Sequence, residues 1–197
     1  ISPSILNRLC QSSLIQISEH PNGKRYTMHR LLRQFALEHF TDQHERYEAE
    51  LRHCRYYLAF AAAREERLAK NDPRAAAAEI WDEIDNIRQA WIWAAQHGHF
   101  DEIANSLNAF YHFYMVTALL VDRVHMFEIA YRALSKLDPY NNDDWQIRQL
   151  YGKLSGFYSI ALVRNAQNKQ AKQIIEQLFE HEQAGQLGLV LAHMAHS

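Results

Sequence analysis

The first forty residues show two periodicities of hydrophobic and polar residues, one typical of helices and one typical of strands. Apolar residues at helical intervals predict a short helix over residues 3–12. A β-prone run over 14–17, turn residues at 21–23 and a second extended run over 25–28 predict a β-hairpin. The helical spacing then returns from Leu31 onwards. The chain is therefore predicted to begin with a helix, a hairpin and a second helix.

From about residue 42 to the end, long amphipathic helices are expected to follow one another, with short interruptions at 71–73, 97–99, 138–142 and 183–185. Short connections favour antiparallel neighbours. Two stripes of apolar residues at helical spacing are predicted to be buried, one made of Ile80, Ile84, Ile87, Trp91 and Ala95, the other of Ile103, Leu107, Phe110 and Tyr114. Helix pairs that recur at about 34–40 residues indicate a helical solenoid.

Together these patterns predict a mainly α fold with two domains. Residues 1–41 are expected to form the C-terminal part of a winged helix, and residues 42–197 an antiparallel solenoid similar to tetratricopeptide repeats. The resemblance to those repeats rests on two segments, 131–141 and 154–178, the first of which ends in Asp138-Pro139.

Composition narrows the classes of function. Hydrophobic residues make up 48% and charged residues 22% of the 197 residues, which is typical of a globular protein. The formal net charge of −2 gives no general attraction for nucleic acid, so contact with DNA would need a local patch. One candidate patch contains the basic residues of the hairpin and its flanking helices, namely Arg8, Lys24, Arg25, Arg30 and Arg33.

Cellular location is predicted from what the sequence lacks. Cys10 and Cys54 match no zinc or redox spacing, which favours a reducing, cytoplasmic environment. No apolar run approaches the roughly 20 residues of a membrane span. Because the chain starts with Ile1, it is expected to be a piece of a longer protein.

Several segments resemble a known family of regulators. The stretch from Ser13 to Ala36, the sequence Glu83-Ile84-Asp85-Asn86-Ile87-Arg88 and the Trp-Ala pair that follows it are similar to signal-transduction ATPases of the NB-ARC kind, also called STAND regulators. The resemblance implies the end of a winged helix joined to the first helical repeats. It also implies ATP or ADP as a cofactor of the full-length protein, bound by an ATPase domain that lies elsewhere.

Met28-His29-Arg30 corresponds to the Met-His-Asp motif of that family. The resemblance implies that His29 contacts the phosphates of ADP in the resting state, although Arg30 replaces the usual Asp. A purely local role, at the junction of hairpin and helix, is the alternative. No cofactor is expected in this chain by itself, because it contains no G-x-x-x-x-G-K-[ST] loop to cradle phosphate.

Neither catalysis nor metal binding is predicted. Asp82, Glu83 and Asp85 point to different faces of a helix at their spacing, and no serine or cysteine lies in a recognisable nucleophile motif. His97 and His99 straddle a glycine in a predicted loop, and His193 and His196 lack acidic partners that would complete a metal site.

Aromatic residues supply the candidate binding surface. The run Tyr111-His112-Phe113-Tyr114 is too continuous for all of its side chains to lie in one buried stripe. Trp93 lies close in sequence to Trp91, which is predicted to be buried, so it too is either a core residue or part of a binding surface. Core packing is one interpretation. The other is a concave groove that binds a protein, a peptide or a small-molecule inducer.

The predicted function is that of a non-catalytic sensor or interaction arm in a multidomain signal-transduction ATPase or transcriptional regulator. Binding of the signal to the repeats would change the winged helix, which would in turn change the nucleotide state of the missing ATPase domain. That ATPase domain is therefore an expected partner. Contact with DNA is not expected. The alternative is a DNA-binding winged-helix regulator with a helical ligand or dimerisation domain.

Overall fold

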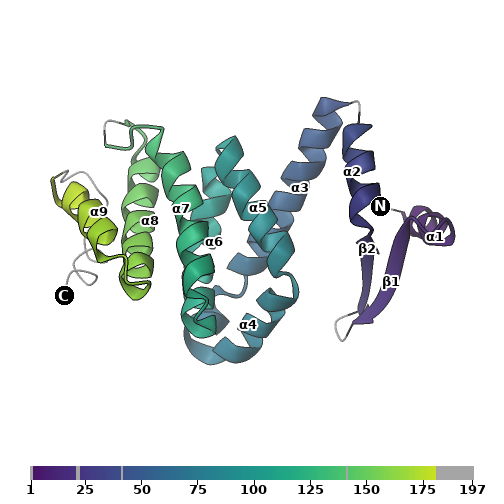
Figure 1. Cartoon of the computed structure of the whole chain (residues 1–197), viewed down its shortest axis with the longest axis horizontal. Helices are drawn as coiled ribbons and strands as arrows, with labels where there is room; N and C mark the ends of the chain where they lie inside the picture. Colours follow the sequence, from purple (N-terminus) through teal and green to yellow (C-terminus); the bar gives the residue numbers. More distant parts are fainter. Residues whose placement is uncertain (1, 21–22, 41, 141, 181–197) are drawn as a thin grey trace. The chain divides into compact units, whose positions relative to one another are not determined.

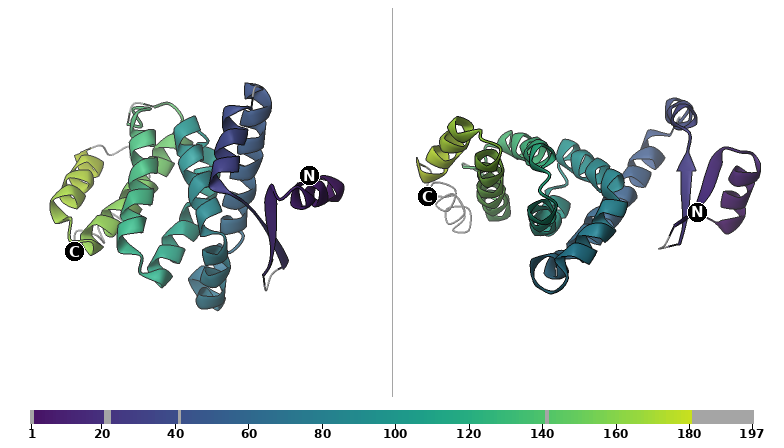
Figure 2. Two further views of the ribbon diagram at one scale, coloured as in Figure 1. Left: turned by 45° about the vertical axis from the view of Figure 1, so that its right-hand side comes forward. Right: turned by 60° about the horizontal axis from the view of Figure 1, so that its bottom comes forward.

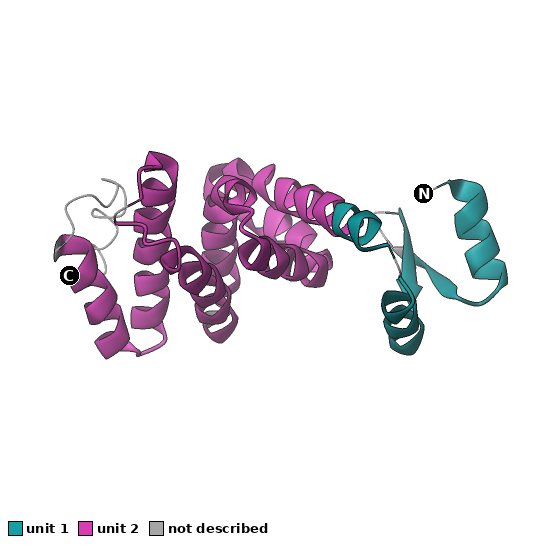
Figure 3. Ribbon diagram, turned by 90° about the horizontal axis from the view of Figure 1, so that it is seen from above, with its two compact units in different colours: residues 1–49 teal, residues 50–197 magenta. Residues whose placement is uncertain are grey.

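The computed structural model describes residues 2–20, 23–40, 42–140 and 142–180. The chain divides into two compact units, residues 1–49 and 50–197 (Figure 3). The predicted boundary after residue 41 falls at a position outside the described residues. The observed division lies inside a long helix, Gln43–Ala62, which begins in the first unit and continues through the start of the second.

The first unit consists of α1 (Pro3–Gln11), β1 (Ile15–His20), β2 (Gly23–Met28) and α2 (Arg30–Glu38), followed by the start of α3 (Gln43–Ala62). The Ser2 side chain caps α1 by accepting from the Ser4 backbone N–H at 3.3 Å. The strands pair antiparallel, with Ile15 opposite Met28 and His20 opposite Gly23. The predicted order of helix, hairpin and helix is confirmed.

The second unit is helical throughout its described part. After α3 come a π-helix, η1 (Arg67–Asn71), and the helices α4 (Pro73–Asp82), α5 (Ile84–His97), α6 (Phe100–Thr117), α7 (Leu120–Ser135), α8 (Trp145–Arg164) and α9 (Asn168–Glu180). Within this unit α4 packs on α6 and α6 on α8, while α5 packs on α7 (Figures 1 and 2). Helices α4, α6 and α8 thus form one layer, α5 and α7 form a second, and α9 packs on α8. The mainly α repeat architecture is confirmed.

Both predicted apolar stripes lie in the core of this unit. Trp91 is fully buried, stacks on Phe110 with ring centroids 4.2 Å apart, and donates its indole N–H to the Met126 carbonyl at 2.9 Å. A buried indole therefore has its one polar atom satisfied. The stripes come from neighbouring helices and meet, which is how each pair buries an apolar face that it could not bury alone.

The predicted interruptions at 71–73, 97–99 and 138–142 are confirmed, and the one at 183–185 lies outside the described residues. Gly98 has φ 74° and closes α5, where the His99 N–H reaches the Ala94 carbonyl at 2.9 Å. Four further breaks, at 63–66, at Glu83, at 118–119 and at 165–167, were not predicted. The stripe from Ile80 to Ala95 is therefore shared by two helices rather than one.

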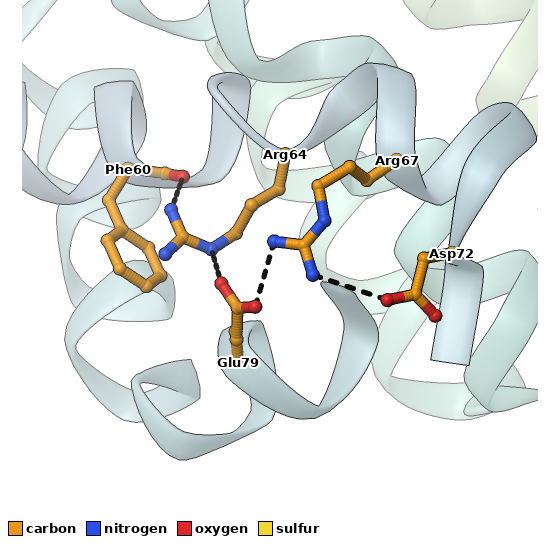
Figure 4. Close-up of polar contacts among 5 residues, drawn as sticks. All are labelled: Phe60, Arg64, Arg67, Asp72 and Glu79. Atoms are coloured by element: carbon orange, nitrogen blue, oxygen red, sulfur yellow. Dashed lines mark hydrogen bonds and ion pairs between the residues drawn. The ribbon is translucent and has the colours of Figure 1, made fainter. Parts of the chain in front are cut away.

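A charged network ties the π-helix to its neighbours (Figure 4). Arg64 donates to Glu79 at 2.9 Å, and Arg67 donates to the other oxygen of the same carboxylate at 2.8 Å. Arg64 also lies over the Phe60 ring, 3.3 Å from its centroid. One carboxylate on α4 thereby holds two guanidinium groups, one from the turn that follows α3 and one from η1. Polar contacts therefore fix the irregular segment between α3 and α4.

Candidate functional site

The aromatic run on α6 divides between two environments. Phe113 and Tyr114 are fully buried and pack in the core. The Tyr114 hydroxyl donates to Asp122 at 2.7 Å, and Arg88 donates to the same carboxylate at 2.7 Å. Burial, more than the neighbouring Asp122, holds the pKa of Tyr114 above its ordinary value. These two residues are core residues, and the Tyr114 hydroxyl has a structural partner.

Tyr111 and His112 are half-buried on the side of α6 that meets α8. The Tyr111 ring stacks on Phe157 with centroids 4.1 Å apart. Burial and the nearby Lys153 lower the pKa of His112, and Glu65 opposes this effect. Tyr111 therefore contributes to the contact between α6 and α8, and His112 is a half-buried imidazole whose charged form is disfavoured.

Trp93 is also half-buried, but it lies at the contact of α5 with α3. Its indole N–H donates to Glu50 at 2.8 Å, and its ring stacks with those of His97 and His99 at 4.3 and 5.0 Å. The structure does not bring Trp93 together with the α6 residues in one groove. Partner binding by the predicted residues stays a prediction.

A cleft of about 540 Å³ lies between the first half of α6 and the first half of α8. None of the predicted aromatic residues lines it. Its walls combine carboxylates, amides, one lysine and apolar side chains from Phe100, Asp101, Ala104, Asn105, Asp144, Trp145, Gln146, Ile147, Gln149, Leu150 and Lys153. Trp145 is 56% exposed at its edge. Such a mixture suits a ligand with both polar and apolar parts.

The α8 wall of this cleft begins at a capped helix end and contains a half-buried lysine, Lys153. Asp144 caps α8 by accepting from the Gln146 N–H at 2.9 Å, which fixes where the helix starts and where Trp145 lies. Burial lowers the pKa of Lys153, while Glu65 acts in the opposite direction. Sequence patterns gave no signal for this cleft, because its residues occupy the exposed faces of two helices about forty positions apart.

His29 lies at the N-cap of α2, where its Nδ1 accepts from the Leu31 N–H at 3.3 Å. Its side chain is exposed. This contact corresponds to the local role of His29, whereas contact with nucleotide remains a prediction. Of the candidate basic patch, Arg8, Lys24, Arg30 and Arg33 are exposed and Arg25 is half-buried.

The described residues were also compared with what a reactive thiol, a metal site and a membrane span require. Cys10 and Cys54 are not joined in a disulfide, and burial raises the pKa of the Cys54 thiol to about 12, which disfavours the nucleophilic thiolate. No group of His, Cys, Asp and Glu among the described residues could hold a metal ion; His193 and His196 lie outside them. No described helix is both long and apolar enough to span a membrane.

Comparison with known proteins points to regulators of transcription. The chain is 34% identical over 105 residues to "Putative HTH-type transcriptional regulator Rv0890c" of Mycobacterium tuberculosis and to "Putative HTH-type transcriptional regulator Mb0914c" of Mycobacterium bovis. The match covers 52% of this chain and 12% of each relative, so the chain spans a small part of their length. No family model and no solved structure matches the chain significantly.

Proposed function

We propose that this chain is the sensor and interaction arm of a helix-turn-helix transcriptional regulator, and that its helical unit binds the signal. The single observation that carries the proposal is the mixed polar and apolar cleft between α6 and α8, in a chain similar to proteins named as transcriptional regulators. Stacked helix pairs expose one extended face, and adjacent helices of that face form such clefts. The signal is a small molecule or a peptide with both polar and apolar groups.

The cleft is tested in the full-length regulator with a transcriptional reporter. Trp145→Ala and Asn105→Ala alter exposed side chains on the two walls without removing core residues. We expect either variant to lose the response to the natural inducing condition. Lys172→Met, on the exposed face of α9, is the matched control and should respond normally. Normal induction in both cleft variants would exclude the cleft as the signal site.

Direct DNA contact by the first unit is a second candidate, because its basic residues are mostly exposed and the relatives are named as helix-turn-helix regulators. In this case Lys24→Glu combined with Arg25→Glu should weaken binding of the full-length regulator to a labelled operator duplex. Each lost phosphate contact should also reduce the slope of log affinity against log salt concentration by about one. Unchanged affinity and slope would place the DNA contact elsewhere.

The link to an ATPase rests on the resemblance to NB-ARC regulators. We propose that the chain alone neither binds ATP nor catalyses a reaction, and that ADP is held by another domain of the full-length, cytoplasmic protein. Titration calorimetry of the chain with ATP should then show no heat of binding. In the full-length protein, His29→Ala should speed ADP release if His29 contacts the phosphates, because the substitution removes a contact made only in the resting state.

A further inference from the structure

The guanidinium group of Arg123 is buried, and no described residue of opposite charge pairs with it. Arg123 lies in the first turns of α7 and is 1% exposed. Its Nε and Nη2 atoms have no hydrogen-bond partner in the part of the chain that the structure describes. The remaining nitrogen, Nη1, donates only to the Met115 sulfur at 3.4 Å, and a thioether is a weak acceptor. An arginine normally extends its head group to water or pairs it, so this arrangement leaves a charge uncompensated.

The two free nitrogens lie on one edge of the guanidinium plane. In arginine, Nε–H and one N–H of Nη2 point in the same direction and form the fork that receives two oxygens of a carboxylate in parallel hydrogen bonds. Arg123 therefore presents a complete bidentate donor edge, and Met115 occupies the other side of the group. A single water molecule cannot match two parallel donors as a planar carboxylate does.

The surroundings favour an anion. The adjacent carboxylate, Asp122, already accepts from Arg88 and from the Tyr114 hydroxyl. Neither Asp122 nor any other described carboxylate makes an ion pair or hydrogen bond with Arg123. Burial and the second cation Arg164 lower the pKa of Arg123, whereas Tyr111 raises it. The first turn of α7 also has no side-chain cap, so its free N–H groups add positive partial charge at this end.

We propose that Arg123 anchors a binding site for the carboxylate of a small organic acid, in the region of α6, α7 and the end of α8. The ligand is small because Nε and Nη2 are each almost inaccessible, so a folded partner surface cannot reach them. This proposal does not depend on the cleft between α6 and α8, because Arg123 does not line that cleft.

The site is tested on the whole chain with acetate, succinate and citrate as probes, by titration calorimetry and by thermal unfolding at ionic strength matched with sodium chloride. Wild type should bind at least one probe saturably, with a matching rise in melting temperature. Arg123→Met keeps the apolar stem and removes the charge, and should weaken binding at least tenfold. Without a probe it should be at least as stable as wild type, because an unpaired buried charge has been removed.

Three further variants make the result specific. Arg123→Lys keeps the charge but loses the fork, and should also bind at least tenfold more weakly. Arg132→Met removes an exposed arginine of the same helix, and Asn105→Ala alters the cleft; both should bind as wild type does. Saturable binding of equal affinity in Arg123→Met or in Arg123→Lys would overturn the proposal. So would the absence of any saturable, carboxylate-dependent response in wild type.

Discussion

A single carboxylate, that of Asp122, organises the polar part of the core where α5, α6 and α7 meet. It accepts from the Tyr114 hydroxyl at 2.7 Å and from two nitrogens of Arg88 at 2.7 and 3.1 Å. Each donor comes from a different helix than the acceptor. Because the Tyr114 ring is fully buried, its hydroxyl depends on this one acceptor.

Two substitutions should therefore differ in their effect on the free energy of unfolding. Tyr114→Phe removes one donor and leaves Asp122 paired with Arg88, so we expect a loss of about 1 kcal/mol. Asp122→Ala leaves the Tyr114 hydroxyl buried without a partner and removes the main partner of Arg88, so we expect about 2 kcal/mol or more. Urea denaturation measures both. A larger loss for Tyr114→Phe would show that Asp122 is not the centre of the network.

At the scale of elements, the π-helix η1 depends on the charge of Glu79. The hydrogen bond from Arg67, with additional attraction from Arg64, holds the pKa of Glu79 below its ordinary value, while partial burial opposes this shift. A carboxyl group with a lowered pKa in the folded state contributes stability above its pKa in the unfolded chain. That contribution is lost as the pH falls through the lowered pKa.

Glu79→Gln should consequently be less stable than wild type at about pH 7, and the difference should shrink steadily as the pH falls towards about 3. Urea denaturation at a series of pH values measures this difference. Glu176→Gln, which alters an exposed pair with Lys172, is the control and should differ little from wild type at any pH. A difference for Glu79→Gln that does not change with pH would assign the effect to packing rather than charge.

Some helix ends could be predicted from residue type and others could not. Gly98 and the sequence Asn71-Asp72-Pro73 mark breaks by residue type, and both breaks are confirmed. Ala118 and Ala166 end α6 and α8 in the left-handed region, with φ 54° and 59°, although alanine is a strong helix former. Their conformations follow from tertiary packing of the flanking helices, which no local pattern records. The cleft between α6 and α8 also depends on how two helices pack, so the sequence pattern did not predict it.

Ala166 allows the role of packing at these helix ends to be tested. The Gln167 N–H donates to the Leu162 carbonyl at 2.9 Å, so Ala166 occupies the position that glycine usually takes in this helix-ending motif. Ala166→Gly should raise the free energy of unfolding by about 0.5–1 kcal/mol, because it removes a Cβ strained at positive φ. Ala78→Gly, at an exposed position inside α4, should lower it by about 1 kcal/mol. Thermal and urea unfolding distinguish these opposite signs, and a loss of stability in Ala166→Gly would contradict the argument.

At the scale of the whole molecule, the two units differ in how much apolar surface they bury. In the described part of the first unit, Ile15 is the only buried hydrophobic residue. Large apolar side chains are exposed on its helices and strands and in the segments between them, namely Ile5, Leu14, Ile17, Tyr26, Met28, Leu31, Phe35, Leu37, Phe40 and Tyr47. The helical unit instead has a continuous core from Cys54 to Leu178. Sequence patterns identified the helix, hairpin and helix of the first unit and the helical character of the second. Burial depends on what packs against each element, and periodicity alone does not show this.

This contrast predicts independent stability for one part only. A chain of residues 43–180 keeps the whole of α3 and the described core, so its urea midpoint should match that of the full chain closely. A peptide of residues 2–40 should be unfolded, because a helix, hairpin and helix with one buried hydrophobic residue cannot offset the entropy of ordering about 1–2 kcal/mol per residue. Amide dispersion in NMR spectra measures both. Well-dispersed amide signals from the peptide would show that it has a core of its own, and the first unit would then need no further apolar surface from the regulator.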